Sequence, residues 1–260
     1  MSGELRGRRI LTTRPAHQSR GWRAQLEAAG ATVDNIPMLA IEAIDSGPEQ
    51  QAIKNQILDF DLADHAIFVS QNAVRIGFDW IEGYWPQLPK GPRYYAIGAA
   101  TARALRERGV AVEADDDTMD SEALLALPAL RDIAGQRALI FRGYGGRTLI
   151  GETLRDRGAR VDYCELYRRL LPPDAPQQLA AYAQQPDAIS VHSGETLANL
   201  AQCIGQSGRE SLRNALLVCP SRRVAEQARG LGFSRIHGAR NAGDSAMLEA
   251  LRTGLADRLR

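Results

Sequence analysis

Short apolar runs and longer segments of helical periodicity alternate along the whole chain. Each apolar run ends in a small or polar residue, and apolar positions then recur every three or four residues. This alternation is typical of βα units and parallel sheets, so the sequence predicts an α/β fold. Strands are expected at 9–13, 32–36, 66–70, 94–97, 110–113, 138–142, 160–167, 188–192, 216–219 and 234–237, with helices between them.

The pattern occurs twice in the chain. The segment RRILTTRPAHQSRGWRAQLEAAGATV, from Arg9, has the same order of strand, turn and helix as QRALIFRGYGGRTLIGETLRDRGARV, from Gln136. Gly30 and Gly158 occupy matching positions in the two segments. Three more pairs follow in the same order: HAIFVSQNAV with DAISVHSGETL, YAIGAATARALRERGVAV with LVCPSRRVAEQARGLGFSRI, and DSEALLAL with DSAMLEAL. Because four blocks recur in one order, we infer an internal duplication.

Two domains are expected, because 260 residues can form two cores of ordinary size. The proline-bearing stretches 36–50 and 165–178 occupy the same place in each repeat and are the expected crossings between the domains. One domain would then be discontinuous, residues 1–37 plus 168–260, and the other would span residues 38–167, including the connecting strands. Both are expected to be similar open parallel-sheet domains of the flavodoxin-like type.

Composition argues against several classes of function. A net charge of +1 lacks the broad positive field of a nucleic-acid binder. No segment approaches the ~18 apolar residues of a membrane helix or resembles a signal peptide, so a cytoplasmic protein is expected. The three cysteines and four histidines form no paired motif, which predicts neither a disulfide framework nor a metal site. Only Lys54 and Lys90 of the 32 basic residues are lysines, so the chain strongly favours arginine. Arginine suits carboxylate and phosphate binding, but a GC-rich genome produces the same bias. Only the arginines in strand-to-helix turns are therefore considered as ligand-binding candidates.

Ligands of open parallel sheets bind beyond the carboxyl ends of the strands, where helix N-termini present free N–H groups. Six predicted turns lie there: TTRP (12–15), SQNA (70–73), GAAT (98–101), RGYGGR (142–147), HSGE (192–195) and PSRR (220–223). Their Ser, Thr, Gly and Arg content suits anion binding. Capping alone is the alternative at each turn, because Ser and Thr are ordinary N-caps and Gly is an ordinary turn residue.

The RGYGGR turn is the most specific of the six. Its glycines allow close approach of a ligand to the backbone, and Arg142 and Arg147 flank it. It has neither GK[ST] nor GxGxxG spacing, which weakens kinase and dehydrogenase interpretations. Ser193 lacks the GxSxG context of a nucleophile elbow. Tyr167 ends a long predicted strand at the second crossing. Its phenol could face a cleft between the domains as a hydrogen-bond donor or weak acid. The alternative is a half-buried tyrosine whose ring packs at the edge of the core.

In their order and spacing these motifs resemble the uroporphyrinogen-III synthases of tetrapyrrole biosynthesis. The resemblance covers nearly the whole chain, from LTTRP, IFVSQNAV and AIGAATARALRERGV through LIFRGYGGRTLIGETLRDRGARVDYCELYRR to SVHSGETLANL and CPSRRVAEQARGLGF. It implies two α/β domains joined by a short two-stranded connection, with the substrate in the cleft between them. It also implies a monomer that uses no cofactor and no metal.

The implied reaction takes linear hydroxymethylbilane, expels its hydroxyl as water, inverts ring D through a spiro intermediate and closes the macrocycle to uroporphyrinogen III, as a hydro-lyase. The substrate carries eight carboxylates, which suits backbone N–H groups, arginines and hydroxyls around a wide cleft. The main task is geometric, and one hydroxyl donor for the leaving water is the acid required. The expected partners are this substrate and, transiently, the preceding deaminase, with no nucleic acid and no membrane.

By this resemblance, Tyr167 matches the tyrosine proposed to assist the leaving hydroxyl, and Thr101 and Ser221 match hydroxyl positions assigned to substrate binding. Ser221 and Arg222 stand where some relatives have two threonines, which leaves the contacts there open. Further candidates for substrate binding are Arg14, Ser70, Arg142, Gly143, Arg147, Ser193 and Arg222. The alternative function is a non-enzymatic two-lobed sensor that closes on a small anionic ligand, because the candidate turns contain no strong acid, base or nucleophile.

Overall fold

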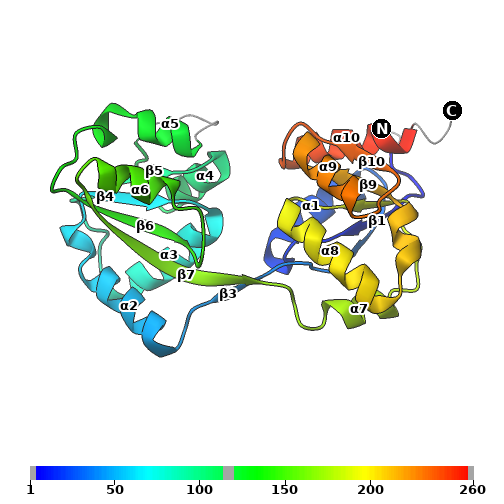
Figure 1. Cartoon of the computed structure of the whole chain (residues 1–260), viewed down its shortest axis with the longest axis horizontal. Helices are drawn as coiled ribbons and strands as arrows, with labels where there is room; N and C mark the ends of the chain where they lie inside the picture. The colour runs from blue at the N-terminus through cyan, green and yellow to red at the C-terminus, as the bar shows by residue number, and fades with distance from the viewer. Residues whose placement is uncertain (1–3, 114–119, 257–260) are drawn as a thin grey trace. The chain divides into compact units, whose positions relative to one another are not determined.

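The chain folds into two compact units in the computed structural model, which describes residues 4–113 and 120–256 (Figure 1). Unit 1 comprises residues 1–40 and 170–260, and unit 2 comprises residues 41–169. The expected crossings, after residues 37 and 167, differ from these bounds by a few residues. The chain passes between the units at the start of β3 (Ala40–Ala43) and the end of β7 (Arg160–Leu170), which are neighbours in one sheet.

Unit 1 contains a five-stranded sheet in the order β10-β9-β8-β1-β2. All of its pairs are parallel, with Thr12 opposite both Asn35 and Ser190 where the strands end. Its strands are β1 (Arg9–Thr12), β2 (Thr32–Asn35), β8 (Ala188–Ser190), β9 (Leu216–Cys219) and β10 (Ile236–Gly238).

Unit 2 contains the second five-stranded sheet, in the order β3-β7-β6-β4-β5. The pairs β4/β5, β4/β6 and β6/β7 are parallel, and they involve β4 (His65–Phe68), β5 (Arg93–Ala96) and β6 (Arg137–Gly143). The strand predicted at 110–113 does not form within the described residues. A strand requires several successive residue pairs. In this stretch, the described residues form only one isolated parallel bridge, between Val112 and Tyr94. Residues 114–119 lie outside the described part.

Each sheet combines half of one repeat with half of the other. Strands β1 and β2 from the first repeat lie beside β8, β9 and β10 from the second, whereas β6 and β7 from the second lie beside β4 and β5 from the first. The orders β9-β8-β1-β2 and β5-β4-β6-β7 therefore correspond strand by strand. Because of this exchange, unit 1 is built from two separate stretches of the chain.

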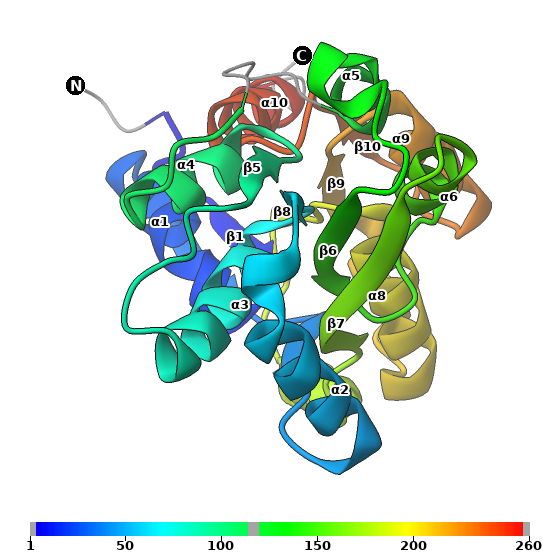
Figure 2. The same cartoon turned by 90° about the vertical axis from the view of Figure 1, so that its left-hand side faces the viewer.

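Helices cover both faces of the sheet in unit 2 (Figure 2). Side chains alternate along a strand, so Phe68 and Phe141 point to one face, where their rings stack 4.3 Å apart, and Ile67 and Ile140 point to the other. The first face packs against α2 (Gly47–Leu58), α3 (Gln71–Tyr84) and α4 (Ala99–Glu107). The second packs against α5 (Ser121–Ala126) and α6 (Leu149–Asp156), and short 3-10 turns lie at Phe60–Leu62 and Pro128–Leu130.

Unit 1 is layered in the same way. Leu11 and Leu217 face α7 (Ala175–Ala181), α8 (Gly194–Ser207) and α9 (Arg222–Gly230), with a 3-10 turn at Glu210–Asn214. Ile10 and Val218 face α1 (Ala16–Ala28) and α10 (Asp244–Ala256).

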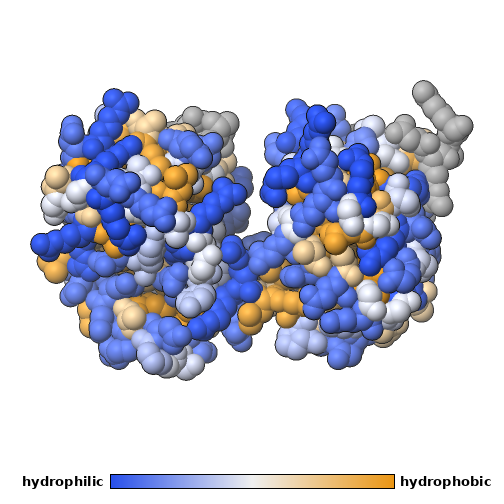
Figure 3. Space-filling view, viewed as in Figure 1, coloured by the Kyte–Doolittle hydropathy of each residue, from blue (hydrophilic) through white to orange (hydrophobic). Residues whose placement is uncertain are grey.

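Hydrophilic side chains cover most of both units on the face shown in Figure 3, and apolar residues form separate patches there. Cys164, Cys203 and Cys219 are buried free thiols, and burial raises the pKa of each. None of the helices in the described residues has the length and apolar character needed to span a membrane.

Candidate functional site

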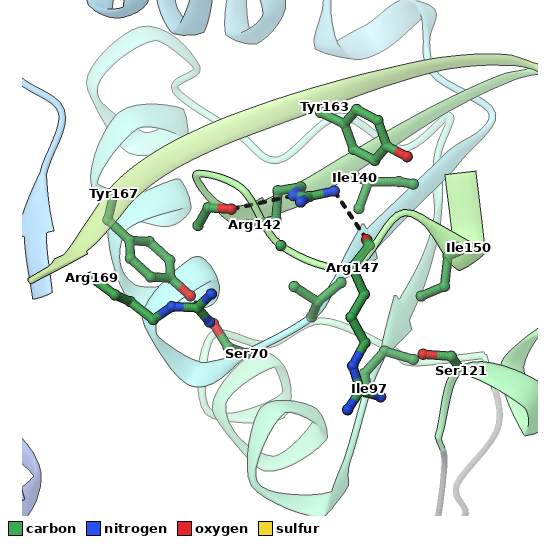
Figure 4. Close-up of a pocket in the computed structure, with 13 residues that line it drawn as sticks. Ser70, Ile97, Ser121, Ile140, Arg142, Arg147, Ile150, Tyr163, Tyr167 and Arg169 are labelled. Carbon is green, nitrogen blue, oxygen red and sulfur yellow. Dashed lines mark hydrogen bonds between the residues drawn. The ribbon is translucent and has the colours of Figure 1, made fainter. Parts of the chain in front are cut away.

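A pocket of about 270 Å³ lies in unit 2, beyond the carboxyl ends of its parallel strands (Figure 4). This is the edge where ligands of open parallel sheets bind. The pocket is lined by Val69, Ser70, Ile97, Ser121, Ile140, Arg142, Gly143, Gly146, Arg147, Ile150, Tyr163, Tyr167 and Arg169. The sequence candidates Ser70, Arg142, Gly143, Arg147 and Tyr167 are thus brought together from three separate segments.

Tyr167 is buried in this pocket, with 3% of its surface exposed. Its phenol oxygen lies 2.8 Å from the Ser70 hydroxyl, and either group can be the donor. Ser70 is also the N-cap of α3, where its Oγ accepts the Ala73 N–H at 3.0 Å. The tyrosine hydroxyl is therefore held at the positive end of a helix.

A β-bulge and a glycine determine where the Tyr167 ring lies. The register of β6 and β7 shifts so that Arg142 pairs with Glu165 and Gly143 pairs with Tyr167, which leaves Leu166 without a partner on β6. The ring packs directly on Gly143, because a Cβ there would lie 2.6 Å from Cε2 of Tyr167. Gly143 thus acts as a platform for the tyrosine ring, a role that the sequence did not suggest.

Arg142 is buried, with 4% of its surface exposed, and it binds its own loop. Its Nε donates to the Gly143 carbonyl at 3.2 Å, and its Nη1 donates to the Arg147 carbonyl at 3.1 Å. Its Cζ lies 4.5 Å from the centre of the Tyr163 ring, and Glu165 approaches its Nε at 3.6 Å. These contacts fix the RGYGGR turn around the guanidinium, as the dashed lines of Figure 4 show.

Two other arginines give the pocket its positive charge. Arg147 is exposed, and Figure 4 shows its side chain extending along the pocket toward Ile97 and Ser121. Arg169, like Tyr167 on β7, also lines the pocket. The apolar residues of the lining are Val69, Ile97, Ile140 and Ile150, which together are called the apolar wall.

Sequence analysis missed Arg169 because the strand expected at 160–167 was too short. β7 continues to Leu170, so three more residues follow Tyr167 on the strand, and Arg169 is the second of them. The arginine pair directly after ELY was the available signal. Tyr163 was missed as well, although it precedes Tyr167 on the same strand.

Thr101, Ser221 and Arg222 lie outside this pocket. Thr101 is buried in the first turn of α4, with 3% of its surface exposed. Ser221 is in unit 1, where it caps α9 by accepting the Val224 N–H at 3.4 Å. The Arg222 side chain is 92% exposed and pairs with Glu226 at 3.1 Å.

Arg14 and Ser193 also belong to unit 1, at the carboxyl ends of its strands. Arg14 pairs with Asp244 at 2.7 Å and lies over the Trp22 ring, 5.6 Å from its centre. Ser193 caps α8 by accepting the Thr196 N–H at 3.0 Å. Both side chains thus have partners within their own unit.

His192 precedes Ser193 and is unusual for its buried ring nitrogens. Neither Nδ1 nor Nε2 has a hydrogen-bond partner within the described residues, and the ring meets Trp22 edge-on at 5.6 Å between centres. Burial, reinforced by the Arg14 charge, lowers the pKa of His192 well below its usual value. The imidazole is therefore neutral at pH 7. No group of three or more His, Cys, Asp or Glu side chains suited to a metal ion occurs in the part of the chain that the structure describes.

Comparison with known proteins identifies the family. The family model described as uroporphyrinogen-III synthase HemD matches residues 21–249. The chain belongs to the uroporphyrinogen-III synthase family. It is 38% identical to the uroporphyrinogen-III synthase of Salmonella typhimurium over 247 residues, which cover 93% of this chain and 99% of that protein. The Escherichia coli uroporphyrinogen-III synthase is 36% identical over 246 residues, with the same coverage.

Solved structures of uroporphyrinogen-III synthases share the fold. A mutant enzyme from Thermus thermophilus superposes with a TM-score of 0.61 at 20% identity and covers 96% of this chain and 100% of its own. The Helicobacter pylori protein gives 0.60 at 17% identity, covering 97% and 100%. The predicted fold class and the family resemblance are confirmed.

Proposed function

We propose that this member of the uroporphyrinogen-III synthase family cyclises linear hydroxymethylbilane to uroporphyrinogen III in the porphyrin pathway. The reaction loses one water and inverts ring D, which makes the enzyme a hydro-lyase, and we expect it to act as a cytoplasmic monomer. The proposal is supported by a family match over most of the chain. The geometric observation that carries it is the Tyr167 phenol, which lies among arginines in a pocket at the ligand-binding edge of a parallel sheet.

Tyr167 is the acid for the first step in this proposal. Its phenolic proton passes to the substrate hydroxyl, the carbon–oxygen bond breaks and water leaves. The electron pair for this departure comes from the adjacent pyrrole, whose N–H proton is released as the azafulvene forms. A proton then returns to the phenolate, so the net change is loss of one water. A phenol suits this task because it can donate a proton without being charged beforehand.

The other residues of the pocket bind and orient the substrate. Arg147, whose exposed side chain extends along the pocket, pairs with a substrate carboxylate, because a guanidinium can hold both carboxylate oxygens. The apolar wall packs against a pyrrole ring. Arg142 contributes indirectly, because its donors hold the loop that carries Arg147. Fixing the bilane in one folded conformation is the main catalytic task.

Separation of the product isomers tests the proposed function. Purified protein is supplied with hydroxymethylbilane that the preceding deaminase generates in the same vessel, and the oxidised porphyrins are resolved by chromatography. We expect the type III isomer to dominate, whereas the reaction without this protein gives the uninverted type I isomer. Formation of type I alone would show that the chain is no synthase and would favour the two-lobed sensor.

Tyr167→Phe tests the acid. The change removes the phenol hydroxyl and keeps the ring on Gly143, so we expect the fold to remain and type III formation to slow by about 10²-fold, as loss of an acid does. Initial rates are measured beside circular dichroism and thermal unfolding. A variant with full activity would remove the tyrosine from the mechanism.

A further inference from the structure

We propose that Ser70 acts on the reaction through Tyr167, by donating a hydrogen bond to the phenol oxygen, and that it does not bind the substrate itself. This inference rests on the proposed function, because it takes Tyr167 as the acid. Ser70 is then a positioning residue with two effects. It leaves the phenolic proton free for the leaving group, and it stabilises the phenolate that proton transfer creates.

The first effect, a phenolic proton that is free for the leaving group, follows from the number of hydrogen bonds that the Ser70 hydroxyl can make. Ser70 Oγ has one hydrogen and two lone pairs, and it accepts the Ala73 N–H at 3.0 Å. Within the described residues, the second hydrogen bond of this hydroxyl joins it to the Tyr167 oxygen at 2.8 Å. If the phenol donated in this pair, its proton would be held by Ser70 and withheld from the pocket. When Ser70 donates, the phenolic proton is free to meet a ligand.

The helix supplies the second effect. Ser70 caps the N-terminus of the 14-residue helix α3, whose dipole places positive charge there. A phenolate at 2.8 Å from this cap would accept an O–H···O⁻ bond, which is stronger than the bond to the neutral phenol. The gain arises as charge develops on the oxygen, so it lowers the barrier more than it strengthens substrate binding.

The second unit offers a comparison in which a serine only caps. Ser193 is the N-cap of α8 and accepts the Thr196 N–H at 3.0 Å, the distance found at Ser70. Its other contact is the Thr196 hydroxyl of the same turn, at 2.9 Å. Capping a helix at this position therefore requires no tyrosine. The Ser70–Tyr167 bond joins residues 97 positions apart and is an addition to the cap.

Three substitutions separate the cap from the donated hydrogen bond. Ser70→Gly removes the hydroxyl, yet glycine is nearly as good an N-cap as serine, whereas Ser70→Ala removes both the hydroxyl and the cap. Ser70→Thr keeps both. We expect kcat for type III formation to fall about 10- to 100-fold in the Gly and Ala variants alike, the size of a hydrogen bond to a charged group, with KM little changed. The Thr variant should restore most of the activity.

A double-mutant cycle with Tyr167→Phe completes the test. In that background Ser70→Gly should cost less than about twofold, because the phenol oxygen on which it acts is absent. The inference is overturned if Ser70→Gly costs as much in both backgrounds, if only the Ala variant is impaired, or if Tyr167→Phe is fully active. These outcomes differ from failure of the proposed function, in which the wild-type protein forms no type III isomer.

Discussion

The two arginines of the RGYGGR turn have different surroundings, although the sequence presents them alike. Arg142 is buried and donates to two carbonyls of its own loop, whereas the exposed Arg147 extends along the pocket. Sequence analysis could predict that both lie at a ligand-binding edge, because that follows from the strand before them. It could not assign their roles, because burial depends on Tyr163 and Glu165, which come from another strand.

Gly143→Ala tests how closely the Tyr167 ring is held. A Cβ at position 143 would lie 2.6 Å from Cε2 and 2.8 Å from Cζ of the ring, so the ring or the backbone must shift, and we expect the ring's hydrogen bond to Ser70 to weaken. We expect type III formation to slow at least as much as in Tyr167→Phe. Overpacking should also lower the free energy of unfolding by about 1–3 kcal/mol, measured by urea denaturation.

The variant Gly143→Ala/Tyr167→Ala is the control for this collision. Removing the ring removes the atoms that the new methyl group meets, so the combined loss of stability should be smaller than the sum of the two single losses. Additive losses would show that the methyl group disturbs something other than the tyrosine. In that case Gly143 would not be the platform of the ring.

At the scale of elements, continuous apolar runs predicted most strands, because helices bury both faces of each sheet. The errors have local causes. Residues 110–113 are apolar enough for a strand but make only one bridge. Residues 40–43 form β3, where the residues alone predicted a crossing and the family resemblance implied a two-stranded connection. The residue pattern gives no strand signal there, because this edge strand is only partly buried and has no continuous apolar run. The bulge opposite Gly143 was not predictable, since it is a matter of register between two strands.

Helix α8 provides a prediction at this scale. Ser193 accepts the Thr196 N–H at its start, so Ser193→Ala should lower the free energy of unfolding by about 1 kcal/mol, the usual value of an N-cap. Ser193→Asp should retain most of the stability, because aspartate caps as well as serine does. Urea denaturation followed by circular dichroism measures both. Equal stability of the Ala and Asp variants would show that the cap contributes little to α8.

At the scale of the molecule, the duplication was predictable and its pairing followed from the crossings. Local patterns identified two repeats. The matched proline-bearing stretches indicated that the first βα unit belongs to a different domain from the strands that come directly after it in the sequence. The structure places that unit, β1 to β2, in a sheet with β8 to β10. Periodicity alone cannot reveal such an exchange, because each half would have the same pattern in either sheet.

At the residue before the matching helix cap, unit 2 has Val69 and unit 1 has His192, and the histidine predicts a loss of stability in acid. Val69 precedes the α3 cap and His192 precedes the α8 cap. Burial, and next the Arg14 charge, lower the pKa of His192, so the folded protein keeps the ring neutral while the unfolded chain binds a proton near pH 6.5. Because the unfolded state then holds more protons, stability falls as the pH drops below about 6.5 and recovers above it. Arg14, paired with Asp244, is the charged group beside the ring.

His192→Val should therefore flatten the loss of stability between pH 7 and pH 5, by up to about 1 kcal/mol for each pH unit. The free energy of unfolding is measured by urea denaturation at each pH for the wild-type protein and the His192→Val variant side by side. The sign is specific, because a histidine that gained a partner on folding would stabilise the protein at low pH instead. An unchanged slope in His192→Val would show that the folded protein takes up this proton as readily as the unfolded chain does.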